Sequence, residues 1–174
     1  MLSFDLRALE EQAAAVDGDL AADDAVWMEG DPRPAGPIRV TGRLSRAGDG
    51  RFYFSGHVEG TAVGECRRCL TDVSTPVRFD PHLIFAEEGL DDEDDPSDAY
   101  PFDPGERSLD LRPAVREEWL LAVPAFPLCR EDCKGLCPRC GADLNAGACA
   151  CPPESDSRWA ALQAPAAGRD ADDR

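Results

Sequence analysis

The positions of the eight cysteines constrain this chain more than any other feature of its sequence. Six of them lie between residues 128 and 151, in LCREDCKGLCPRCGADLNAGACAC, and two lie far upstream, in GECRRCL. A Cys-x-x-Cys pair can place two thiolates on one tetrahedral zinc ion. The spacing therefore predicts two sets of four metal ligands: Cys66, Cys69, Cys129 and Cys133 in the first set, and Cys137, Cys140, Cys149 and Cys151 in the second.

The second set is compact in sequence, whereas the first set joins distant parts of the chain. Gly141 follows the CPRC turn of the second set, and glycine tolerates the positive φ that lets backbone N–H groups fold back onto the sulfurs. Cys149 and Cys151 would complete that site. The first set combines the upstream CRRC pair with Cys129 and Cys133, so a metal bound there would tie the two halves of the chain together.

Three other uses of cysteine fit some of these spacings. Disulfides suit secreted chains, but the first twelve residues, MLSFDLRALEEQ, carry charges where a signal peptide needs an apolar run. A thioredoxin-like pair sits between a strand and a helix, whereas Cys66 lies among alternating, strand-like residues. An iron–sulfur cluster also accepts four thiolates, and ligand softness does not separate it from zinc.

Charge is the second constraint. The 174 residues include 18 Lys and Arg against 35 Asp and Glu, which gives a net charge of −17. Such a surface repels phosphate backbones over most of its area and attracts basic partners. No apolar run approaches the ~20 residues that a membrane span requires. We therefore expect a cytoplasmic protein with reduced thiols and no membrane contact.

Apolar periodicity predicts a sheet that is covered by one helix. Residues 2–6 alternate as a short strand, and residues 8–16 favour a helix. From residue 37 the period becomes two, with a turn at 47–50, which predicts a long antiparallel hairpin. Residues 77–85 predict one more strand, bent at Pro81. Residues 109–124 favour a helix that packs on the sheet, with Pro113 in its first turn.

These patterns predict an α+β fold, with a curled antiparallel sheet, open or barrel-like, one packing helix and a C-terminal Cys-rich zinc region. We expect a sheet domain at 1–125, a Cys-rich region packed on it at 126–163, and a disordered tail at 164–174. Residues 87–104 hold nine acidic and no basic residues, which predicts a disordered, self-repelling loop. A short helix is predicted from Asp156.

Enzymatic chemistry is not expected. The sequence contains no nucleophile elbow, phosphate-binding loop or His-Glu-x-x-His motif. A catalytic zinc keeps an open coordination position and usually has His or carboxylate ligands, whereas sites made of four cysteines are closed and structural.

Three sequence blocks carry a family resemblance: GECRRCL, DLRPAVREEWLLAVPAFPLCREDCKGLCPRCGADLNAGACAC and DSRWAAL. They resemble the YceD-like family of bacterial and plastid proteins, which is tied to accumulation of the large-subunit ribosomal RNA. The resemblance implies a non-enzymatic factor in large ribosomal subunit biogenesis. Besides the eight cysteines, the family positions carried over are Arg68, Leu70, Asp110, Leu111, Glu117, Leu121, Pro124, Gly135, Leu136, Pro138, Gly141, Leu144 and Asn145.

The charge of the chain bears on the partner that the resemblance implies. A protein that acts on ribosomal RNA is expected to be basic, and this one is acidic. The acidic charge and the resemblance agree if the partner is a basic large-subunit ribosomal protein, or a pre-ribosomal particle that presents one. Local contact with ribosomal RNA is allowed at Arg67, Arg68, Arg130, Lys134 and Arg139. The alternative is a zinc-ribbon nucleic-acid-binding module in transcription or RNA handling.

Overall fold

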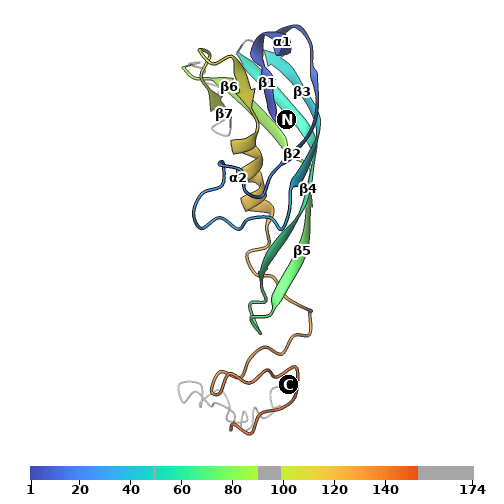
Figure 1. Ribbon diagram of the computed structural model, residues 1–174, viewed down its shortest axis with the longest axis vertical. Coiled ribbons are helices and arrows are strands. Elements are labelled where there is room, and N and C mark those ends of the chain that lie inside the picture. Colours follow the sequence, from blue (N-terminus) through green and yellow to red (C-terminus); the bar gives the residue numbers. More distant parts are fainter. Residues whose placement is uncertain (49, 90–98, 153–174) are drawn as a thin grey trace, which may run out of the picture. The chain divides into compact units, whose positions relative to one another are not determined.

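The computed structural model describes residues 1–48, 50–89 and 99–152 (Figure 1). The chain divides into two compact units, Met1–Cys133 and a second that begins at Lys134. The strands and helices of the described residues all belong to the first unit. In chain order they are β1 (Ser3–Asp5), α1 (Leu6–Glu11), β2 (Ala14–Leu20), β3 (Ile38–Gly48), β4 (Arg51–Glu65), β5 (Asp72–Phe79), β6 (His82–Glu87), β7 (Tyr100–Phe102), β8 (Ser108–Asp110) and α2 (Arg112–Ala122).

One six-stranded sheet forms most of the first unit. Its order is β2-β3-β4-β6-β7, and β5 also pairs with β4. The predicted hairpin is confirmed as β3 and β4, which pair antiparallel from Arg39↔Glu59 to Gly48↔Arg51. The first part of β4 pairs with β6 and its last part pairs with β5. Within the described residues β2, β5 and β7 each pair with one strand only, so the sheet has free edges and is not a closed barrel.

Two predicted elements near the N-terminus are different in the structure. The helix expected at 8–16 begins at Leu6 and ends at Glu11, and Asp5 caps it by accepting a hydrogen bond from the backbone N–H of Ala8. Ala14–Leu20 is strand β2 instead. The reason is visible in the sequence, because buried Val16 and Leu20 alternate with exposed acidic residues at the period of a strand.

The prediction for residues 77–104 was also incomplete. The single bent strand is two strands, β5 and β6, separated at Asp80 and Pro81. Part of the predicted acidic loop is strand β7, which pairs with β6 in parallel, and the rings of Phe85 and Tyr100 lie 5.6 Å apart. Within the predicted loop, residues 90–98 lie outside the described residues. So do the helix predicted from Asp156 and the predicted tail at 164–174.

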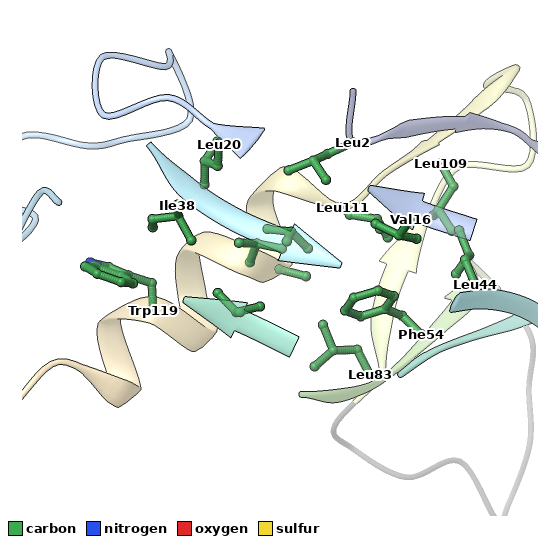
Figure 2. Packing of buried hydrophobic residues seen from close by; sticks show 14 of the residues in the cluster. Leu2, Val16, Leu20, Ile38, Leu44, Phe54, Leu83, Leu109, Leu111 and Trp119 are labelled. Atoms are coloured by element: carbon green, nitrogen blue, oxygen red, sulfur yellow. The ribbon is translucent and has the colours of Figure 1, made fainter. Parts of the chain in front are cut away.

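The predicted packing helix is confirmed as α2. Pro113 lies in its first turn, and Val123 ends it before Pro124. The buried face of α2 carries Ala114, Val115 and Trp119, which contribute to the apolar core that lies between the helix and one face of the sheet (Figure 2). The indole N–H of Trp119 donates to the carbonyl oxygen of Pro32 at 3.0 Å.

The connection between β2 and β3 is fixed to α2 by contacts that the sequence did not reveal. Arg116 donates two hydrogen bonds to the carboxylate of Asp31, at 2.7 and 2.8 Å, and both side chains are largely buried. This guanidinium lowers the pKa of Asp31. Trp27 is also buried, and its indole N–H donates to the carbonyl oxygen of Ala21. This connection is therefore part of the packed unit.

Two glycines face each other across strands β3 and β4. Gly42 and Gly56 are register partners, and a Cβ at Gly56 would overlap the carbonyl oxygen of Thr41. We expect Gly56→Ala to lower the free energy of unfolding by about 1–3 kcal/mol, because the strands must separate. Urea denaturation measures this loss. Gly36→Ala is the matched control, since an added Cβ there meets no atom within 4 Å. Equal stability of the two variants would contradict the packing argument.

No helix in the described parts of the chain is long and apolar enough to cross a membrane.

Candidate metal centres

The first set of cysteines comes together inside the first unit. Cys66 follows directly after β4, Cys69 lies in the turn before β5, and Cys129 and Cys133 lie in the segment after α2. The four Sγ atoms lie within 4.8 Å of one another. The Cys69–Cys129 sulfur distance is 3.6 Å, and the Cys66–Cys133 distance is 3.9 Å. Both pairs join residues that are at least 60 positions apart in sequence.

A tight backbone turn presents the two upstream thiols. The N–H of Leu70 donates to the carbonyl oxygen of Cys66, and the N–H of Cys66 donates to that of Thr71, both at 2.8 Å. Leu70 takes a positive φ of 60°, which is unfavourable for a residue with a branched side chain. The sequence has no glycine here, so only the Cys-x-x-Cys spacing indicated this turn.

Two arginines of the same turn fix the downstream cysteines beside it. The N–H of Arg67 donates to the carbonyl oxygen of Pro127 at 3.0 Å. The guanidinium of Arg68 donates to the carbonyl oxygens of Glu131 and Cys133, at 3.2 and 2.8 Å. The sequence allowed local contact of Arg68 with ribosomal RNA, and the structure uses its guanidinium to hold the two halves of the site together.

The second set lies in the second unit and uses the same turn. The N–H of Gly141 donates to the carbonyl oxygen of Cys137 at 2.9 Å, and the N–H of Cys137 donates to that of Ala142 at 2.8 Å. Gly141 has a φ of 71°, as its position after the CPRC motif predicted. The sulfurs of Cys137, Cys140, Cys149 and Cys151 all lie within 4.8 Å of one another.

Asn145 closes the chain around the second set. Its side-chain oxygen accepts the backbone N–H of Lys134 at 2.8 Å, and its amide nitrogen donates to Asp143 at 2.7 Å. The N–H of Leu144 donates to the carbonyl oxygen of Gly135 at 2.9 Å. No metal-ligand spacing indicates this role of Asn145. Two signals were available: its place among the family positions, and its position in an ADLN turn before two further cysteines.

Hydrogen bonds make one thiol in each set unusually acidic. Backbone N–H groups directed at the sulfur, above all that of Cys129, lower the pKa of Cys66 to about 6 against the opposing effect of burial. Backbone N–H groups of Cys140 and Arg139 lower the pKa of Cys137 to about 6 in the same way. The Thr71 hydroxyl, 3.3 Å from the sulfur, lowers the pKa of Cys69.

The opposite shift occurs at one thiol of each set. Burial raises the pKa of Cys129 to about 12. Hydrogen bonding with Cys140, followed by burial, raises the pKa of Cys151 to about 12. Each set therefore combines a thiol that ionises readily with one that keeps its proton while neighbouring thiolates repel a further negative charge. A divalent cation at the centre would remove that repulsion, because it would attract all four thiolates.

The sulfur geometry fits one tetrahedral ion in each set. Zinc–sulfur bonds of about 2.3 Å place tetrahedral ligands about 3.8 Å apart. The 3.6 and 3.9 Å distances of the first set agree with this value. A cluster of several irons puts its cysteines on different metal atoms and so spreads the sulfurs further apart. If four thiolates held one ion, they would leave no coordination position for a substrate, as in structural sites.

The chain is similar to several known proteins. It is 35% identical to an uncharacterized protein of Mycobacterium tuberculosis, over 62% of this chain and 52% of the relative. It is 29% identical to the uncharacterized protein YlbN of Bacillus subtilis, over 80% of each chain. It is 28% identical to the large ribosomal RNA subunit accumulation protein YCED homolog 1, chloroplastic, of Zea mays, over 87% of this chain and 60% of the relative. The chain spans about half the length of the mycobacterial relatives.

No solved structure matches the chain. The family model described as large ribosomal RNA subunit accumulation protein YceD matches residues 54–164. This match runs from strand β4 through both cysteine sets, so it includes every feature of the two candidate metal centres. The chain therefore belongs to the YceD family.

Proposed function

We propose that this chain is a non-enzymatic factor in large ribosomal subunit biogenesis, which supports accumulation of the large-subunit ribosomal RNA and holds two structural zinc ions. The observation that carries the proposal is the family match over residues 54–164, whose description names that process. The name of the maize relative supports the same process. We place the protein in the cytoplasm, where bacterial ribosomes assemble and thiols stay reduced.

The two cysteine sets support a structural role for the metal. Cys66, Cys69, Cys129 and Cys133 would hold one zinc ion, and the four cysteines from Cys137 to Cys151 would hold the other. Bound zinc would supply cross-links between chain segments. With four thiolates per ion it would have no open position for water or substrate, which supports a factor that binds and does not catalyse.

The functional test is depletion of the protein in its own host. The amount of large-subunit ribosomal RNA is expected to fall relative to small-subunit RNA, and the wild-type chain should restore the ratio. A Cys137→Ser variant should restore it poorly. The control is Gly36→Ala, which adds no contact within 4 Å and should restore it fully. An unchanged ratio on depletion would contradict the proposed function.

The net charge of −17 supports a basic large-subunit ribosomal protein, or a pre-ribosomal particle that presents one, as the partner. We expect the association rate with such a protein to fall by roughly tenfold or more as salt rises, because salt screens exposed charges. Surface plasmon resonance between roughly 50 and 500 mM salt measures this rate. Removing residues 88–98 should slow association and leave dissociation nearly unchanged.

Two results would overturn this choice of partner. Association that does not depend on salt would remove the electrostatic argument. Tight binding to naked ribosomal RNA fragments, in preference to any ribosomal protein, would favour the zinc-ribbon nucleic-acid-binding module instead.

A further inference from the structure

A continuous apolar segment begins in the last turn of helix α2, and four of its nine residues are exposed. Residues 120–128 read LLAVPAFPL, nine residues without a polar side chain, in a chain of which 30% is charged. The side chain of Leu121 is 79% exposed and that of Phe126 is 66% exposed, and Pro124 and Ala125 between them are exposed as well. Single exposed apolar residues are ordinary, but contiguous ones mark interaction surfaces.

The core of the first unit does not account for these side chains. Leu120, Ala122 and Val123 pack against the core, whereas Leu121 points elsewhere. Phe126 is in contact with the guanidinium of Arg67, which lies 4.3 Å from the ring centre. We call Glu117, Leu121, Pro124, Ala125 and Phe126 the α2 exit surface. Its apolar members lie within residues 121–126 and are all exposed to solvent, and we call them the apolar strip.

Acidic groups lie at the helical end of this strip. Glu117 is exposed and precedes Leu121 by four residues, which puts both on one face of α2. A groove beside them is lined by Leu83, Tyr100 and Pro101 and by both glutamates, Glu117 and Glu118, and no Lys or Arg of the described chain lines it. The Tyr100 hydroxyl donates to Glu118 at 3.3 Å, and burial together with these carboxylates raises the pKa of Tyr100.

We propose that the α2 exit surface binds a segment of a partner protein that carries large apolar side chains flanked by Lys or Arg. This inference rests on the proposed function, because it locates the docking site of the basic ribosomal protein. Charge complementarity selects this occupant. Carboxylates beside an apolar strip repel the phosphates of RNA and also a second copy of this acidic chain, and they attract lysine and arginine.

The two kinds of group have separate roles in binding. Burial of Leu121 in the complex removes apolar surface from water, so this side chain controls how long the complex lasts. Glu117 stays at the rim, where a charge mainly changes the rate of encounter. Truncation of the leucine should therefore raise the dissociation rate, and neutralisation of the glutamate should lower the association rate.

The test uses the full chain and a fluorescent synthetic peptide of lysine, leucine and phenylalanine. Leu121→Asp is expected to weaken binding by about tenfold or more, through faster dissociation. Met28→Asp is the matched control, because it adds the same charge and removes a side chain that is also 63% exposed, on the connection between β2 and β3. The control should bind as the wild type does. Glu117→Gln should slow association several-fold.

Several results would overturn the inference. Wild-type affinity of Leu121→Asp would place the binding site elsewhere, and the proposed function would still stand if depletion lowers the ribosomal RNA ratio. Equal binding of a peptide with serine in place of leucine and phenylalanine would exclude an apolar site. Loss of thermal stability in Leu121→Asp but not in Met28→Asp, or dimers in sedimentation, would show that this chain itself covers the surface. Binding of single-stranded RNA that Leu121→Asp abolishes would replace protein by RNA as the occupant.

Discussion

A strong chelator is expected to remove two zinc ions from each chain and to unfold the second unit while the sheet of the first unit survives. The physical reason is the difference between the two cores. The first unit buries an apolar cluster that includes Trp119, Phe54 and Leu44 (Figure 2). Among the described residues from Lys134 onward, Cys137 is the only hydrophobic residue that is buried. Without metal, nothing of comparable strength holds this segment in one conformation.

Acid should have the same effect as the chelator. The pKa of Cys66 and that of Cys137 are about 6 in the folded chain, below the ordinary value for a thiol. A group whose pKa is lower in the folded state stabilises that state fully above its unfolded pKa, and this contribution is lost as the pH falls through the folded value. Bound metal lowers both pKa values further, so we expect metal release only below about pH 6.

Elemental analysis of anaerobically prepared protein measures the number of metal ions per chain directly. Circular dichroism follows the loss of structure when chelator or acid is added. Readdition of zinc should restore the spectrum, which controls for irreversible damage. Protein that contains no metal would refute the metal centres, and one ion per chain would refute the division into two sets. Iron in place of zinc would leave the geometry intact and change only the identity of the ion, since four thiolates bind either metal.

The sequence predicted the parts of this molecule that depend on local spacing. Each Cys-x-x-Cys motif forms the same turn, and the structure brings together the two groups of four cysteines that the spacing indicated. The hairpin of β3 and β4 and the helix α2 also followed from periodicity. For the hairpin and the helix, neighbouring residues carry the information, because side chains two or four positions apart must lie on one face. The first cysteine set was predicted differently, from the need of one metal ion for four thiolates.

Apart from the first cysteine set, contacts between distant segments could not be predicted. Nothing near Asp31 in the sequence indicates that its carboxylate pairs with Arg116, which is 85 positions away. Strand β7 was missed because three residues are too few for a periodic signal, and parallel pairing with β6 decides its conformation. Leu70 adopts a positive φ that local preference disfavours, so the tertiary structure around the first site must impose it.

Loss of one cysteine from each set should expose different parts of the chain to hydrogen exchange. Cys137→Ser removes a ligand from the second set, so the amides of Gly141 and Leu144, which are hydrogen-bonded in that unit, should lose protection. The amide of Arg67 should keep its protection, because its partner Pro127 belongs to the first unit. Cys137→Ser and Cys66→Ser, a variant of the first set, serve as controls for each other.

Cys66→Ser should give the reverse pattern, with a larger effect on the first unit. Its metal would close a loop of 60 residues between Cys69 and Cys129, and opening that loop returns the closure entropy to the chain. The amides of Arg67 and Cys133 should then exchange faster, whereas that of Gly141 should not change. Unaltered protection of Arg67 and Cys133 in Cys66→Ser would show that the distant pairs do not share a metal. If the amides of Arg67 and Gly141 lost their protection together in either variant, the two sites would fold as one unit. Independent sites would lose protection one at a time.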